Sequence, residues 1–186
     1  MRKALHLLGI LDDTDLEWMT SNGTLVHVGV QSILIEENTP IAAIYILLEG
    51  ELSVLVGGLG GKHIATLLPG EVVGEMSFVD SRPPSASVLA TTDSYVLALS
   101  TESLSAKLAT DYAFASRFYY SVATFLADRL YVTVGRYGYG SAKQDTDVDE
   151  VPDASLDKID MAAVRFDQLL KRLRVDYAGR EIVSSN

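Results

Sequence analysis

The residues of this chain best suited to ligand chemistry lie in residues 74–88, GEMSFVDSRPPSASV, a segment that we call the cassette. Gly74 lets the backbone turn and approach a ligand closely, because glycine adopts positive φ freely. Glu75 offers a carboxylate, and Ser85 and Ser87 offer hydroxyls that both donate and accept hydrogen bonds. These groups, with nearby free amides, can hold a small polar ligand. On chemistry alone, an ordinary turn between two strands is an equally good interpretation.

Other candidate motifs do not support catalysis or metal binding. The run GGLGGK at residues 57–62 resembles a phosphate-binding loop, but His63 stands where that loop needs Ser or Thr. The run also joins two predicted strands instead of opening a helix. His6, His27 and His63 lack the spacing of metal ligands, and the chain has no cysteine, GxSxG or HExxH. We therefore expect no enzyme activity, no catalytic residue and no metal site.

The composition predicts one globular domain with an appendage. The chain has 186 residues, of which 48% are hydrophobic and 22% charged, so it can build a core and is not wholly disordered. Its net charge of −10 repels phosphate backbones and anionic lipid, which argues against nucleic acid or membrane as a partner. The start, MRKALHLLGIL, imitates a signal peptide but lacks a small-residue cleavage site. An amphipathic first helix in a cytoplasmic protein is the favoured interpretation.

Hydrophobic periodicity divides the chain into a β part and a helical part. Between residues 26 and 99, short apolar runs alternate with turn residues, which is typical of a roll, barrel or sandwich. After Leu99 the period becomes helical. Ser100 or Thr101 is suited to cap a short helix, and Asp111 a longer one.

The longer predicted helix is apolar on two faces. Residues 112–134 contain no Gly or Pro. One apolar stripe comprises Phe114, Phe118, Val122 and Phe125, and beside or opposite it lie Ala115, Tyr119, Leu126 and Leu130. Because both faces must be buried, we expect one to pack on the β part and the other to pair with a second subunit in a homodimer.

The C-terminal part combines an acidic stretch with a last helix. Acidic residues cluster in residues 144–160, and the helix is predicted over residues 156–175. Its heptad seam comprises Leu156, Ile159, Ala163, Phe166, Leu170 and Leu173. Packing on the same molecule and pairing with another chain both remain open. The predicted division is an N-terminal helix with the β part (1–110), a dimerisation helix (111–140), an acidic linker (141–155), and a C-terminal helix and tail (156–186).

The chain resembles the cyclic nucleotide-binding domains shared by the catabolite activator protein, the regulatory subunits of protein kinase A and gated channels. The resemblance spans roughly residues 10–130 and rests on the strand pair IYILLEGELSVLV, the turn LPGEVVGEM and the cassette. The cassette residues that match the family pattern are Gly74, Glu75, Met76, Ser77, Ser85, Ala86, Ser87 and Val88. The resemblance implies a mainly β fold, a β-roll (double-stranded β-helix or jelly roll) flanked by helices, and a site for cyclic AMP or cyclic GMP.

The chain also departs from the family pattern. Pro84 stands in place of the phosphate-binding arginine, and Arg82 is the nearest substitute. An arginine–phosphate pair is geometrically exacting, so Arg82 is not equivalent to the missing side chain. Gln31 and Asn38 stand where the family has turn glycines; Asn tolerates left-handed backbone, whereas Gln is harder to explain.

The resemblance assigns a role to each candidate site residue. Glu75 is expected to contact the ribose hydroxyl. The amides of residues 74–77, with the hydroxyl and amide of Ser85, are expected to serve the phosphate. Ser121 or Thr124 on the long helix is expected to meet the base.

Two functions fit these observations. One is a regulatory module whose nucleotide binding is weak or altered, because losing one member of a buried charge pair costs about 2–5 kcal/mol. The other is a dimerisation or docking module that kept only the fold. The chain after Val134 is expected to be too short for a helix-turn-helix unit of family size. Output is therefore expected through an unidentified protein partner or through self-assembly.

Overall fold

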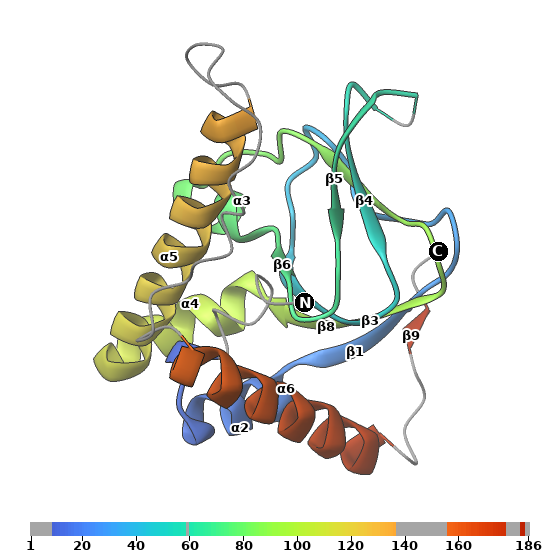
Figure 1. The fold of residues 1–186 in the computed structure, drawn as a ribbon. Coiled ribbons are helices and arrows are strands. Elements are labelled where there is room, and N and C mark those ends of the chain that lie inside the picture. The colour runs from blue at the N-terminus through green and yellow to red at the C-terminus, as the bar shows by residue number, and fades with distance from the viewer. Residues whose placement is uncertain (1–8, 59, 137–155, 178–182, 185–186) are drawn as a thin grey trace.

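The computed structural model describes residues 9–58, 60–136, 156–177 and 183–184 (Figure 1). The predictions for the first eight residues and for the acidic linker at 141–155 lie outside the described residues. Two sheets and five helices are placed in the described part of the chain.

The two sheets form the predicted β-roll. One has the strand order β6-β3-β8-β1-β9 and the other β2-β7-β4-β5. The strands are β1 Thr24–Val28, β2 Ile33–Ile35, β3 Ala43–Glu49, β4 Leu52–Val56, β5 Lys62–Leu67, β6 Val72–Val73, β7 Ser87–Ala90, β8 Ser94–Ser100 and β9 Val183–Ser184. Neighbouring strands are antiparallel except β9, which runs parallel to β1. The fold prediction is confirmed.

The helices begin where their capping residues predict. They are α2 Asp13–Asn22, α3 Glu75–Asp80, α4 Thr101–Thr110, α5 Tyr112–Arg136 and α6 Leu156–Tyr177. The Ser100 hydroxyl accepts a hydrogen bond from the Ser103 amide and caps α4. The Asp111 carboxylate accepts one from the Phe114 amide at the start of α5. Both predicted caps are confirmed.

Helix α5 runs along the side of the roll (Figure 1). The stripe predicted to face the β part is buried there: Phe114, Phe118, Val122 and Phe125. On the remaining surface, Tyr119 and Leu130 are exposed, while Leu126 packs partly against the core. One apolar face of α5 is therefore covered by its own chain, and a second face is left open.

Helix α6 packs against α2 in the same molecule, beneath the roll in Figure 1. Leu169 and Leu173 are buried in the core, and Phe166 and Leu170 pack partly against it. The predicted heptad seam needs correction, because it omits Leu169 and includes Ala163, which is exposed. The stripe follows the i, i+3, i+4, i+7 spacing of a helix on a globular surface, not the narrower seam of a coiled coil.

Candidate functional site

Helix α3 lies between β6 and β7 and begins at a glycine that no other residue can replace easily. Gly74 precedes the helix with φ of 90°, in the left-handed region. A Cβ atom at this position would lie 3.0 Å from the Ile41 side chain and 3.3 Å from the Ala43 carbonyl oxygen. Both the backbone conformation and the close contacts therefore require glycine. This geometry places Glu75 at the first position of the helix, where its side chain turns inward.

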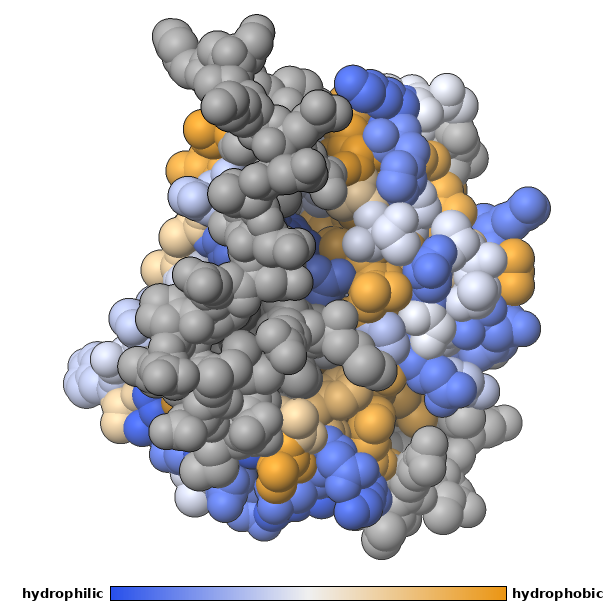
Figure 2. Space-filling view, in the orientation of Figure 1, coloured by the Kyte–Doolittle hydropathy of each residue, from blue (hydrophilic) through white to orange (hydrophobic). Residues whose placement is uncertain are grey.

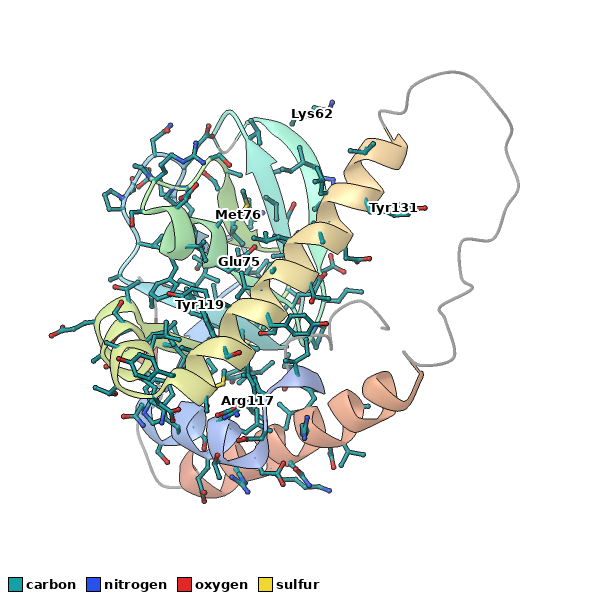
Figure 3. All side chains as sticks on the ribbon, turned by 90° about the vertical axis from the view of Figure 1, so that its left-hand side faces the viewer. Lys62, Glu75, Met76, Arg117, Tyr119 and Tyr131 are labelled. Carbon is teal, nitrogen blue, oxygen red and sulfur yellow. The ribbon has the colours of Figure 1, made fainter. Side chains whose placement is uncertain are left out.

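Glu75 is buried and paired with an arginine from the long helix. Its side chain is 2% exposed, and its Oε1 accepts a hydrogen bond of 3.0 Å from Nη1 of Arg129 on α5. Figure 3 shows Glu75 between α3 and α5. The Arg129 guanidinium also lies over the Phe125 ring, 4.2 Å from its centroid. The ion pair joins the cassette to the C-terminal half of α5.

Two features of the environment of Glu75 shift the pKa of its carboxyl in opposite directions. Burial raises the pKa of this carboxyl above its ordinary value, while the nearby positive charge of Arg129 lowers it. Desolvation is the larger effect. Arg129 therefore offsets part of the cost of a buried carboxylate, and any ligand group that reaches Glu75 meets a charge pair rather than a lone acid.

The sequence analysis did not single out Arg129. One local signal was available, because Arg129 follows Phe125 by four residues and so lies beside a residue of the predicted buried stripe. The partner, Glu75, is 54 residues away in the sequence. No local pattern links the two.

The second half of the cassette contains a buried proline, Pro84. Pro84 is buried, and its carbonyl accepts a hydrogen bond of 2.8 Å from the Asn38 amide. Ser85, predicted to serve a phosphate, is exposed, and Ala86 is half-buried. The Ser87 hydroxyl is buried and accepts a hydrogen bond from the Glu37 amide.

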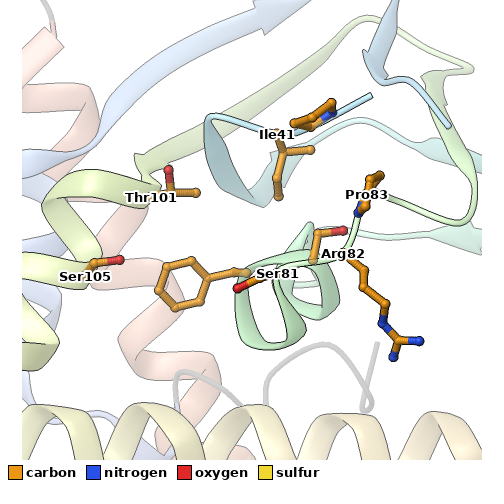
Figure 4. A pocket seen from close by; sticks show the side chains of 9 residues that line it. Ile41, Ser81, Arg82, Pro83, Thr101 and Ser105 are labelled. Atoms are coloured by element: carbon orange, nitrogen blue, oxygen red, sulfur yellow. The ribbon is translucent and has the colours of Figure 1, made fainter. Parts of the chain in front are cut away.

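The Arg82 side chain is exposed and pairs with its neighbour Asp80. The side chain of Arg82 is 81% exposed, and its Nε and Nη2 lie 2.7 Å and 2.6 Å from one Asp80 oxygen. The Arg82 amide donates to the other oxygen, and this backbone bond is the main reason that the pKa of Asp80 is lowered. Figure 4 shows the guanidinium turned away from Ile41 and Thr101. In this arrangement Arg82 does not take the place that Pro84 leaves without charge.

The remaining candidate residues are spread over different environments. Met76 is exposed on α3. Ser77 lines a pocket of about 280 Å³, together with Phe78, Arg82 and Ser105, and Glu75 is not among the lining residues of this pocket (Figure 4). Only part of the predicted site is therefore brought together in one place.

Two hydroxyls of α5 are predicted to contact the base of a nucleotide. In this structure each of them donates a hydrogen bond to a carbonyl of its own helix. Ser121 is fully buried and donates to the Phe118 carbonyl. Thr124 is half-buried and donates to the Tyr120 carbonyl. Ser121 thus faces the core in this structure.

The two non-glycine residues at turn positions adopt the conformation that glycine would favour. Gln31 has φ of 64° and Asn38 has φ of 63°, both in the left-handed region. Both turns therefore have the left-handed backbone that glycine adopts most easily. Gln31 carries the larger strain, because its side chain gains less from local hydrogen bonding than that of Asn.

Comparison with known proteins agrees with this geometry. Residues 25–111 match the family model of the cyclic nucleotide-binding domain. A cyclic nucleotide-binding domain from Methylobacillus flagellatus KT is similar at 21% identity and a TM-score of 0.66, covering 76% of this chain and 85% of that one. The catabolite activator protein of Thermus thermophilus is similar at 21% identity and a TM-score of 0.58, covering 95% of this chain and 90% of that one.

A third similar structure is the N-terminal domain of a transcriptional regulator from Streptomyces coelicolor A3(2). It has 24% identity and a TM-score of 0.57, over 67% of this chain and 90% of that one. No curated protein matches the chain in sequence. Residues 25–111 match the cyclic nucleotide-binding domain family, and the chain has the β-roll fold of the similar structures. It is a family of regulatory domains that sense cyclic nucleotides.

Two further searches of the described residues gave no candidates. None of the helices in that part of the chain is long and apolar enough to cross a bilayer. The same residues contain no group of three or more His, Cys, Asp or Glu side chains placed to hold a metal ion.

Proposed function

We propose that this protein is a cytoplasmic regulatory module that binds cyclic AMP or cyclic GMP weakly or in an altered way. It acts through a protein partner or through its own assembly and is not an enzyme. The left-handed backbone at Gly74 and the inward carboxylate of Glu75 support a ligand site at the cassette. Pro84 removes the guanidinium that would pair with the phosphate. Losing such a partner costs about 2–5 kcal/mol, which weakens binding by roughly thirty-fold to several thousand-fold.

The observation that carries the proposal is the ion pair between Glu75 and Arg129. A ribose hydroxyl that donates to Glu75 would change the charge environment of Arg129, which is part of α5. A nucleotide at the cassette would then move α5 only if it binds more tightly to one position of α5 than to another. In this proposal the inward carboxylate is the sensing group and α5 is the element that responds.

Assembly is proposed through the outer face of α5. This face carries the exposed residues Tyr120, Ala123, Ala127, Leu130, Tyr131 and Val134. Figure 2 shows apolar side chains along the outer edge of this helix, and Figure 3 shows Tyr131 pointing away from the body of the molecule. Small and aromatic side chains in one stripe suit close pairing of two helices, and pairing removes apolar surface from water. The proposed assembly is a homodimer.

A second function, docking without any ligand, is favoured by a specific observation. Pro84 is buried and bonded to Asn38, and Arg82 is bonded to Asp80. The cassette is thus closed by contacts within the chain. A module of this kind would keep the roll and α5 as a scaffold and respond to no nucleotide.

Calorimetric titration with cyclic AMP and cyclic GMP separates the two functions. The wild type should bind one of them weakly, and Pro84→Arg should tighten binding by about thirty-fold or more, because the variant restores the charge pair. Arg82→Ala is the control and should leave the wild-type affinity unchanged. If the wild type binds at micromolar affinity and Arg82→Ala abolishes this, Arg82 holds the phosphate and the weak-binding proposal is wrong. If neither protein binds while both fold, the scaffold function is the better account.

A further inference from the structure

The C-terminal segment, described over residues 156–177 and 183–184, contacts the rest of the molecule in two different ways. Helix α6 packs on α2, and β9 adds to the edge of β1 in parallel, with Val183 opposite Val26 and Ser184 opposite His27 (Figure 1). A helix in a groove and an added edge strand are the two commonest ways in which a folded surface binds a peptide. We call the segment the strap and the surface of α2 with the edge of β1 the seat.

The ion pairs between strap and seat are long, and each joins an exposed acid on α2 to a less exposed arginine on α6. Arg165 Nε lies 3.6 Å from Asp13, and Arg172 Nη1 lies 3.9 Å from Glu17. The two acids are 70% and 69% exposed, whereas the Arg165 and Arg172 side chains are 16% and 41% exposed, so salt reaches both pairs from the side of the acid. Arg165 also donates to the Gly9 carbonyl at 3.0 Å. Charge therefore contributes to holding α6 on α2, and reversing it places like charges opposite one another.

The apolar contacts are few and specific. Leu169 and Leu173 are fully buried in the cluster that includes Leu16 and Met19 of α2. The opposite side of α6 carries Val164, which is exposed, and an exposed pair between Lys171 and Asp167. The seat thus selects an amphipathic helix with arginines next to a pair of leucines, in the pattern R-x-x-x-L-x-x-R-L that begins at Arg165.

We propose that the seat is a docking surface for an amphipathic helix with arginines beside its leucines, followed by an extended segment, and that the strap occupies it in cis as a displaceable occupant. A partner protein that presents the same pattern of arginines and leucines would compete with the strap. The 19 residues from 137 to 155 connect the strap to α5 and can span at most about 60 Å when extended, so a displaced strap stays near its seat. This proposal does not depend on nucleotide binding.

The first experiment measures whether charge holds the strap. The chain has no cysteine, so spin labels at Ser21→Cys on α2 and Gln168→Cys on α6, both exposed, report one distance in the full-length protein. In Arg165→Glu/Arg172→Glu the short distance should be replaced by a broad, longer distribution. Adding Asp13→Arg/Glu17→Arg to this variant should restore the short distance. Lys171→Glu, which changes a charge facing away from α2, is the matched control and should have no effect. A short distance that persists in Arg165→Glu/Arg172→Glu would show that the strap is a fixed part of the core.

The second experiment measures docking in trans. A labelled peptide of residues 156–184 should bind full-length Arg165→Glu/Arg172→Glu, whose seat is intact and released. Binding should weaken at least about tenfold when salt rises from 0.05 M to roughly 0.5 M, and by a similar factor when Asp13→Arg/Glu17→Arg is added. A scrambled peptide of the same composition should not bind. Failure of the native peptide to bind a variant whose strap has left the seat would overturn the proposal.

Discussion

Glu75 shows how one residue can serve both the fold and the proposed site. A carboxylate that is 2% exposed needs compensation, and Arg129 supplies it from α5. Because burial is the larger effect on the pKa of Glu75, the folded state binds a proton here more readily than the unfolded chain does. The residue therefore links the stability of the protein to pH.

Substituting Glu75→Gln should reveal this linkage. The pKa of Glu75 is raised in the folded state, so between the two pKa values the folded protein holds more protons than the unfolded one. Wild-type stability should then fall relative to Glu75→Gln as pH rises from about 4.5 toward neutrality. Urea unfolding of both proteins across this range measures the difference. For Glu102→Gln, at an exposed position, the difference in free energy of unfolding from the wild type should not change with pH. The same result for Glu75→Gln would contradict the assigned effect of burial.

At the scale of elements, α2 contacts two of the three helices that follow the roll, α5 and α6. Asp15 takes part in the capping box of α2, where the Asp12 amide donates to its carboxylate. The same carboxylate accepts two hydrogen bonds, of 2.6 Å and 2.7 Å, from Arg117 on α5. On its other side α2 contacts α6. Arg117 therefore connects α5 to the N-terminal end of the helix that carries the seat.

Asp15→Asn should destabilise the protein by about 3 kcal/mol. This is the lower end of the range for breaking a buried pair, because the Arg117 side chain is 30% exposed and keeps a contact of 3.0 Å with Asp12. The free energy of unfolding from urea titration measures the loss. Glu17→Gln, on the same helix but 69% exposed, should change it by less than about 1 kcal/mol. Equal effects of the two substitutions would rule out a special role for Asp15.

For the whole molecule, the outer face of α5 decides the proposed assembly. The wild type should be a dimer at tens of micromolar by light scattering, and Leu130→Glu should make it a monomer. Leu130 is 63% exposed in the single chain, so the charge is tolerated there and penalised only in a dimer. Leu126 is unsuitable for this test because it packs partly on the core. Val30→Glu, at an exposed turn away from α5, should leave the dimer intact. A monomeric wild type would contradict the assembly.

Patterns within a few residues predicted most of the fold. Alternation in Leu52, Val54 and Val56 predicts β4, and the side chains of Ser100 and Asp111 predict where α4 and α5 begin. The cassette predicted the family because its glycine and acid must be adjacent for the backbone to turn and the carboxylate to point inward. These features depend on residues that are close together in the sequence, so short sequence patterns are enough to predict them.

The sequence by itself determined the β-roll, the helix starts, the position of the cassette and the absence of an arginine at residue 84. Only the tertiary structure decided that Arg129 meets Glu75, that Arg117 meets Asp15 across 102 residues, and that Leu169 is buried against α2. Each of these contacts depends on the angle and distance at which α5 or α6 crosses the rest of the molecule. Those quantities result from packing many side chains at once, and no spacing within one helix encodes which distant residue it will face.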